Sequence, residues 1–415
     1  MAVVFLAMLV SSAALGLPGA FLKPLNREFG WSTAQISSAL AVRFVLYGLI
    51  APFAAILLER FGVRRIVCTA LCMIACGVLL VTQMTALWQL VFLWGLILGI
   101  GSGLTALVLA ATVANRWFER RRGLVLGLLT ASSATGQLIF LPLASALIAH
   151  FGWRVAVVPV VVSCLAVGLL GLLFLQDRPK SVGLTAFGAD PRSTQESTAA
   201  TRHAGFGMPL SALTSASRSS TFWVLAGTFF VCGLSTSGLI QTHFISLCGD
   251  YGLAAIPAAS VLAMIGAFDF VGTIASGWLS DRFDNRKLLF WYYGLRGLSL
   301  LWLPHSDFTF YGLSLFAMFY GLDWVATVPP TVKLATAAFG KERGPMIFGW
   351  IFAAHQIGSA AAAYGAGLSR TLLLTYSPAL YSAGAACIIA ALAIFLVEPV
   401  KAGRVLAAST PVPQT

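Results

Sequence analysis

Two stretches of this sequence decide its fold: AILLERFGVRR at residues 55–65 and GWLSDRFDNRK at residues 277–287. Each follows a long apolar run, and each contains an acid, an arginine and a phenylalanine in succession, with two further basic residues downstream. The two acids, Glu59 and Asp281, are 222 positions apart. The same offset, without a gap, relates Glu28-Phe29-Gly30 to Asp250-Tyr251-Gly252, Gly127 to Gly349 and Gly136 to Gly358. The chain is therefore predicted to consist of two repeated halves.

The composition predicts that these halves lie in a membrane. Of the 415 residues, 59% are hydrophobic and only 10% are charged, and the mean hydropathy is +0.89. Soluble domains carry about 25% charged residues. The net charge of +12 does not indicate a nucleic-acid partner, because the basic residues lie in short loops between apolar runs and form no stripe interleaved with aromatic residues.

Twelve apolar runs are long enough to cross the hydrocarbon core as helices, which takes about 20 residues. They are expected at 2–23, 33–58, 66–84, 88–114, 123–148, 155–175, 222–247, 256–280, 287–303, 308–336, 345–369 and 376–397. The polar stretch after the sixth run reads as a linker, with a short helix starting at Pro209. We predict an all-α membrane protein of twelve transmembrane helices, with six-helix bundles at 1–175 and 222–398, a cytoplasmic linker at 176–221 and a cytoplasmic tail at 399–415.

The basic residues predict the orientation. With the N-terminus inside, nineteen Lys and Arg residues fall in cytoplasmic loops and tail, and four fall outside. This asymmetry places both termini in the cytoplasm of a multi-pass protein in the cell (inner) membrane. The start, MAVVFLAMLV, has no basic segment before it and is expected to remain as the first helix. Because both halves then share one orientation, the repeat is parallel, and such a repeat places a binding site at mid-membrane between the halves.

The two opening stretches resemble the cytoplasmic signature of the major facilitator superfamily, G-x-L-x-D-R-x-G-R-R. The resemblance implies a cytoplasmic gate, in which a small residue lets neighbouring helices approach and the acid pairs with basic residues until the halves rock. In the first copy Ala55 replaces the glycine and Glu59 replaces the aspartate; in the second copy Asp284 stands where the later glycine is expected. The gate residues expected on this basis are Glu59, Arg60, Arg64, Arg65, Gly277, Asp281 and Arg282.

Three further stretches look like the monocarboxylate and oxalate/formate branch of that superfamily: residues 115–123 (NRWFERRRG), 322–330 (LDWVATVPP) and 355–358 (HQIG). Members of that branch move small carboxylates, often with a proton. The branch often carries an arginine in its eighth helix, whereas residues 256–280 of this chain contain Asp269 and no arginine.

Charged and polar residues inside the predicted helices are the candidates for binding substrate or protons, because each is costly in lipid and needs a partner or a water-filled cavity. They are Arg43, Asp269, Arg296, Asp323, His355, Gln356 and Gln137. Asp269, Arg296 and Asp323 fall near the same depth and are expected to form one cluster, either a structural salt bridge or a site that leaves one acid free. Arg43 and Lys333 could instead extend toward the membrane surfaces, and the glutamines could bond neighbouring helices.

The leading functional hypothesis is a secondary active transporter of a small organic solute that works by alternating access. Arg43, Arg296 and His355 favour a carboxylate anion, and His355 is a candidate for proton coupling. Asp269 and Asp323 would suit the alternative, export of drug-like or amphipathic compounds, and a sensor that binds without transporting also stays open.

Other functional classes find no support in the sequence. No residue constellation indicates an enzyme. Gly95, Gly99 and Gly103 recur every four residues, as in closely packed helices, and no Gly-Lys-Ser/Thr follows, so ATP is not expected as a partner. The seven cysteines lack the partners of a metal site. We expect a monomer with no metal and no cofactor.

Overall fold

The predicted repeat is visible in the backbone. Gly30 and Gly252 both adopt positive φ angles, 69° and 87°. Gly152 and Leu374 are also 222 positions apart, and their φ angles are 85° and 59°. A positive φ is costly for a residue with a side chain. The turn at Leu374 therefore follows the geometry of the repeat and not its local sequence.

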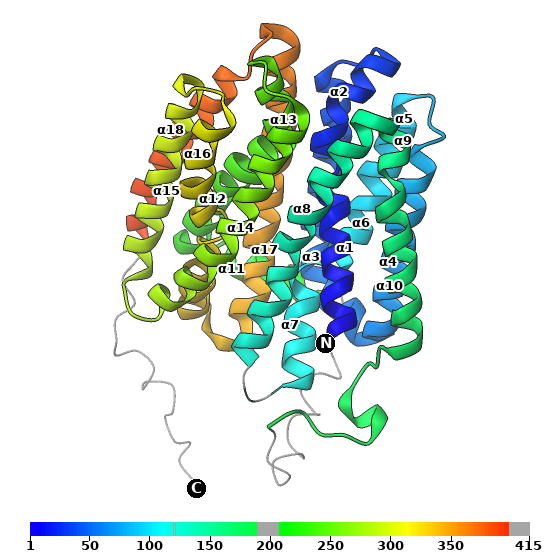
Figure 1. Cartoon of the computed structure of the whole chain (residues 1–415). Coiled ribbons are helices and arrows are strands. Elements are labelled where there is room, and N and C mark those ends of the chain that lie inside the picture. Colours follow the sequence, from blue (N-terminus) through cyan, green and yellow to red (C-terminus); the bar gives the residue numbers. More distant parts are fainter. Residues whose placement is uncertain (119, 121, 189–206, 398–415) are drawn as a thin grey trace, which may run out of the picture.

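The computed structural model describes residues 1–118, 120, 122–188 and 207–397, and this part of the chain is almost entirely helical (Figure 1). The first half contains α1 (Ala2–Gly16), α2 (Pro18–Phe29), α3 (Thr33–Phe61), α4 (Val63–Val81), α5 (Leu87–Leu90), the π-helical η1 (Val91–Ile97), α6 (Leu98–Leu104), α7 (Leu107–Trp117), α8 (Arg122–Phe151), α9 (Trp153–Ala156) and α10 (Val158–Phe174), followed by the short η2 (Pro179–Val182). The second half contains α11 (Gly207–Ala216), α12 (Ser220–Gly233), the π-helical η3 (Leu234–Gln241), α13 (Thr242–Asp250), α14 (Ala255–Ser280), α15 (Asn285–Trp302), η4 (Leu303–His305), α16 (Phe310–Asp323), α17 (Val328–Leu373), α18 (Ser377–Ala393) and η5 (Ile394–Leu396).

The predicted twelve-helix membrane fold is confirmed. Ten helical segments of the described chain are long and apolar enough to span a membrane. The other two predicted spans, 123–148 and 287–303, fall on α8 and on α15, which is short and more polar because it carries Arg286, Lys287 and Arg296. Several spans are not single continuous helices. The first is interrupted at Leu17, between α1 and α2, and α17 contains the non-helical Gly340 (φ 85°, ψ 162°), at which one membrane helix ends and the next begins.

The linker and tail proposed from the sequence are described only in part. The short helix expected at Pro209 is α11, which begins two residues earlier, at Gly207. Residues 189–206 of the proposed linker and the whole proposed tail, 399–415, lie outside the described residues, as does residue 398 at the end of the second bundle. The domain boundaries therefore stay predictions.

The two halves meet along three pairs of helices: α2 with α13, α3 with α17, and α8 with α14. Figure 1 shows α3, α8, α14 and α17 near the middle of the bundle, with α15, α16 and α18 toward one side and α4 and α10 toward the other. Residues on the facing sides of these four helices therefore lie where the sequence predicts the substrate pathway.

The glycines predicted to allow close packing do so. Gly95, Gly99 and Gly103 all face α3, and a Cβ atom on Gly99 would lie 3.0 Å from the carbonyl oxygen of Arg43. In the second half, Gly233 of α12 lies directly against the carbonyl of His355, and Gly358 of α17 against the carbonyl of Phe230. This reciprocal contact brings the backbones of α12 and α17 together, which only small residues permit.

We expect Gly358→Ala to destabilise the protein, because its Cβ would strike the backbone of Phe230, which cannot move as a flexible side chain could. Overpacking of this kind costs about 1–3 kcal/mol. Gly227→Ala is the matched control: Gly227 is in the same helix as Phe230, and its added Cβ would meet nothing within 4 Å. Thermal unfolding in detergent micelles should show a lower Tm for Gly358→Ala and an equal or higher Tm for Gly227→Ala. Equal Tm values for the two variants would contradict the contact.

Candidate functional site

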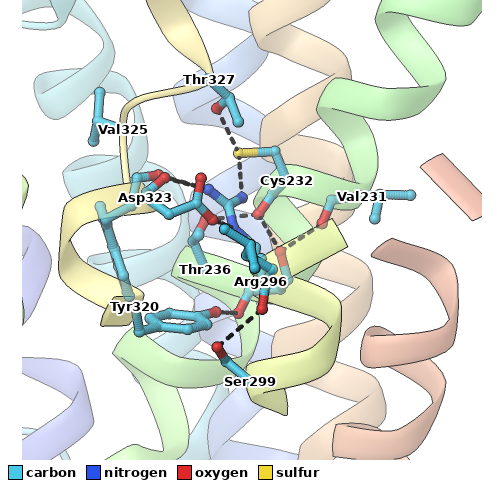
Figure 2. A network of polar contacts seen from close by, with 12 residues as sticks. Val231, Cys232, Thr236, Arg296, Ser299, Tyr320, Asp323, Val325 and Thr327 are labelled. Carbon is cyan, nitrogen blue, oxygen red and sulfur yellow. Dashed lines mark hydrogen bonds and ion pairs between the residues drawn. The ribbon is translucent and has the colours of Figure 1, made fainter. Parts of the chain in front are cut away.

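The membrane helix formed by α16 and the first part of α17 is broken between Asp323 and Val328. A break inside a membrane leaves backbone groups that lipid cannot satisfy. Arg296 of α15 satisfies two of them: its Nη2 donates to the carbonyl oxygens of Asp323 (2.5 Å) and Trp324 (3.2 Å). Its Nε also donates to Oδ2 of Asp323 at 2.7 Å (Figure 2). One guanidinium therefore holds both the side chain and the backbone at the end of α16.

The break is held from α14 as well. Oδ1 of Asp269 accepts hydrogen bonds from the backbone N–H of Val325 (3.0 Å) and from Oγ1 of Thr273 (2.9 Å). Oγ of Ser276, on the same helix, donates to the carbonyl of Ala326 at 2.5 Å. Asp269 thus supports the broken segment through its backbone, whereas the ion pair of Arg296 is made with Asp323.

A fourth helix completes this cluster. Nη1 of Arg296 contacts Sγ of Cys232 at 3.0 Å, and Oγ1 of Thr327 lies 3.3 Å from the same sulfur. Figure 2 shows Cys232 between these two groups. Arg296, Asp269 and Asp323 are all buried, and Oδ1 of Asp323 has no hydrogen-bond partner in the described chain. The structure therefore brings together the three residues predicted to cluster, and it adds Cys232, Thr327 and Ser276.

The first half contains the same break without any charge. α6 ends at Leu104 and α7 begins at Leu107, and Thr105 is the repeat equivalent of Thr327. Oγ1 of Thr105 lies 2.5 Å from Oγ of Ser11 and donates to the carbonyl of Ser102 at 3.1 Å. The polar contacts at the break of the first half are thus made by hydroxyl groups, whereas those of the second half are made by Arg296, Asp269 and Ser276. The pair of equivalent threonines was a signal in the sequence that motif reading missed.

Arg43 of α3 is fully buried and forms no ion pair with any described carboxylate. Its Nη1 donates to the carbonyl of Leu15 at 3.1 Å, beside the bend between α1 and α2, and its guanidinium lies 4.6 Å from the centre of the Phe44 ring. Its Nε is buried without a partner. A guanidinium has five donors, and within the described chain Arg43 uses Nη1 but leaves Nε unpartnered.

Two candidates lie on α17: Gln356 faces α3, whereas the ring of His355 lies 4.9 Å from that of Phe229 on α12. Gln356 packs against Gly48, and its Oε1 is buried without a partner. Half-buried His355 stacks on Phe352 (5.8 Å between ring centres), and the ring of Phe352 in turn contacts that of Tyr47 on α3 (5.6 Å). The backbone of Gln137 lies on α8, but its side chain lies outside the described residues. The structure therefore places Arg43 and Gln356 on facing helices of opposite halves, separately from the Arg296 cluster.

Comparison with known proteins identifies the family. The family model described as Major Facilitator Superfamily matches residues 4–363. The chain belongs to the major facilitator superfamily. Its relatives include the uncharacterized MFS-type transporter YcxA of Bacillus subtilis, 24% identical over 357 residues (84% of this chain, 82% of YcxA), and monocarboxylate transporter 13 of Bos taurus, 28% identical over 370 residues (88% and 81%). The fold is similar to that of a D-xylose-proton symporter, with a TM-score of 0.72 at 14% identity over 96% of this chain and 97% of the symporter.

In this major facilitator the first signature loop is joined to its own half and the adjacent linker. Glu59 accepts from Arg116 (2.8 Å) and from Arg178 (2.9 Å), and Asp177 accepts from the backbone N–H of Arg64 (2.8 Å). The guanidinium of Arg60 lies 5.6 Å from the ring centre of Phe61, and Arg65 is exposed. The sequence did not predict that Glu59 pairs with Arg116 and Arg178, although Arg116 lies in one of the stretches that resemble the monocarboxylate branch.

The second signature loop is likewise joined within its half. Asp281 pairs with Lys333, whose ammonium lowers the pKa of that carboxyl, and Arg282 lies over the ring of Trp278 at 4.0 Å. One expectation was wrong. A Cβ added to Gly277 would meet nothing within 4 Å, so close helix approach does not require glycine there. A role of either loop in gating stays a prediction.

We expect Arg296→Gln to destabilise the fold. The variant leaves the Asp323 carboxylate and two backbone carbonyls buried without their donor, and breaking a buried pair in this way costs about 3–5 kcal/mol. Arg370→Gln is the control, because Arg370 belongs to a partly exposed ion pair whose loss costs about 0–1 kcal/mol. The yield of monodisperse protein and its Tm in detergent measure the difference. A normal Tm for Arg296→Gln would show that the broken segment does not depend on this arginine.

Proposed function

We propose that this chain is a secondary active transporter of a small organic anion bearing a carboxylate, and that Arg43 binds that carboxylate. The observation that carries the proposal is the isolated charge of Arg43. A buried charge without a counter-charge costs several kcal/mol, so the site is suited to a ligand that supplies one. Arg43 lies on α3, which packs against α17 of the other half, and alternating access would expose this contact to each side in turn.

The acids offer less support for a cationic, drug-like substrate. Asp323 is engaged by Arg296, and one oxygen of Asp269 is occupied by the backbone of Val325 and by Thr273. The free oxygen Oδ1 of Asp323 supports a role in proton binding, because a buried carboxylate can take up a proton in place of a missing partner. His355 has a similarly unpartnered Nδ1 and is the second proton candidate.

A sensor is the second candidate function, and a specific relative favours it. The membrane sensor protein UhpC of Salmonella typhimurium is 26% identical to this chain over 250 residues, which is 58% of this chain and 54% of UhpC. The monocarboxylate transporters match over more of the chain. We therefore rank transport first.

We expect wild-type protein in proteoliposomes to accumulate lactate or another short monocarboxylate, and Arg43→Gln to reduce uptake about 10–100-fold, since hydrogen bonds to charged groups contribute about 1.5–3 kcal/mol. Arg43→Lys keeps the charge and should lose less. Arg154→Gln is the control, because Arg154 is an exposed arginine paired with Glu28 in the same half. Lactamide, the uncharged analogue, should not be transported.

Three outcomes would decide against this proposal. Equal transport of lactamide and lactate would remove the requirement for an anion. Normal uptake by Arg43→Gln would remove the assigned residue. Saturable binding of lactate without any accumulation in the vesicles would favour the sensor.

A further inference from the structure

A second charged site lies at one end of the bundle, which we call the distal end. The C-termini of α2 and α13 and the N-terminus of α3 lie there. Figure 1 shows α2 and α13 at this end, opposite the N-terminus of the chain. A cavity of about 430 Å³ opens here between the two halves. Residues of α2, α3, α13 and α17 line it. The cavity is separate from Arg43 and from the Arg296 cluster, since none of these residues lines it.

The charges lining this cavity are unbalanced. Lys23, Arg27 and Arg370 contribute three positive charges, and Asp250 contributes the one negative charge. Asp250 is shared: Oδ2 accepts from Nε of Arg370 at 2.7 Å, and Oδ1 lies 3.3 Å from Nη2 of Arg370 and 3.6 Å from Nζ of Lys23. Arg27 is exposed and makes no ion pair within the described chain. The cavity therefore attracts anions, and a carboxylate of the protein already occupies part of it.

The shared carboxylate also joins the two halves. Lys23 belongs to α2 of the first half, whereas Asp250 and Arg370 belong to α13 and α17 of the second. The ammonium of Lys23 lies directly over Gly249, where a side chain would displace it. Nearby, the backbone N–H of Ala34 donates to Oγ1 of Thr371 at 3.1 Å, again from one half to the other. An ion pair between partly exposed groups is weak, so a ligand can displace it.

We propose that the distal cavity is a carboxylate-binding site and that Asp250 is its internal competitor. A small carboxylate bound by Arg27 and Arg370 displaces Asp250 from Arg370, which weakens the bridge to Lys23 and releases α2 from α13. Ligand binding thereby favours separation of the halves at the distal end. In the open state Arg370 is free to bind the ligand, whereas in the closed state it binds Asp250. The choice of a carboxylate as ligand rests on the proposed function; the bridge itself does not.

The bridge is tested without substrate. Ser246 is buried and lines the cavity, so the rate at which a maleimide labels Ser246→Cys in purified protein in nanodiscs reports opening of the distal end, after subtraction of labelling at the native cysteines. Adding Asp250→Asn should increase this rate about 5-fold, the scale of a partly exposed ion pair. Glu28→Gln is the matched control, because Glu28 pairs with Arg154 at the same end but within one half. An unchanged rate with Asp250→Asn, or an equal increase with Glu28→Gln, overturns the bridge.

The ligand is tested separately from the proposed transport site. Lactate binding is measured by calorimetry on Arg43→Gln, in which the proposed central site is removed. This variant should retain millimolar affinity for lactate, and adding Arg27→Gln should abolish it. Three results would each overturn the carboxylate site. Lactate could bind with the same affinity whether or not Arg27 is present, or lactamide could bind as tightly as lactate. Inorganic phosphate could also bind where lactate does not. The transport activity of Arg43→Gln tests only the proposed function, and the maleimide labelling rates test only the ion-pair bridge between the halves.

Discussion

Lipid cannot form hydrogen bonds with an interrupted helix, and this constraint governs the second half of the protein. Residues 324–327 break a membrane helix, so their backbone groups need partners within the protein. Arg296 reaches in from α15 to bind two of the freed carbonyls, and Asp269 and Ser276 bind from α14. The placement of α14, α15 and α16 around this point follows from that need. The buried charges of the second half thus bind the backbone of the broken segment, and within the described chain Oδ1 of Asp323 is buried without a hydrogen-bond partner.

The two halves share a fold but use different side chains at the break in the membrane helix. At the equivalent break the first half uses the hydroxyls of Ser11 and Thr105, which need no counter-charge. The buried charge of the first half is instead Arg43, which no described carboxylate neutralises. The two halves therefore differ in charge: the second half contains an ion pair between Arg296 and Asp323, and the first contains a buried cation, Arg43, whose guanidinium lies against Leu15 of α1 and Phe44. The proposed carboxylate substrate would supply the counter-charge that Arg43 lacks within the described chain.

The charged groups at the ends of the bundle form partly exposed ion pairs, unlike the buried charges of its interior. The signature loops at one end form ion pairs within a half or with the adjacent linker, as between Glu59 and Arg178 or Asp281 and Lys333. At the distal end, Asp250 joins residues of both halves. Exposed ion pairs contribute little stability, so a contact between halves made in this way can open and close, whereas the buried glycine contacts of α12 with α17 stay within one half and preserve its shape.

The sequence by itself determined the membrane class, the repeat and the number of helices. It also identified the charged residues inside the membrane helices, which need a partner or a ligand. Hydrophobic length, the 222-residue offset and the cost of charge in lipid are all local or periodic properties, and they suffice for these conclusions. They could not decide which of these charged residues meet. Asp269, Arg296 and Asp323 share a depth, but only the crossing of α14, α15 and α16 shows that Arg296 pairs with Asp323 while Asp269 binds backbone. Likewise, Lys23, Asp250 and Arg370 are distant in sequence and looked like ordinary loop charges. Tertiary structure alone brings them to one cavity, because the contacts between halves depend on helix packing that no local pattern encodes.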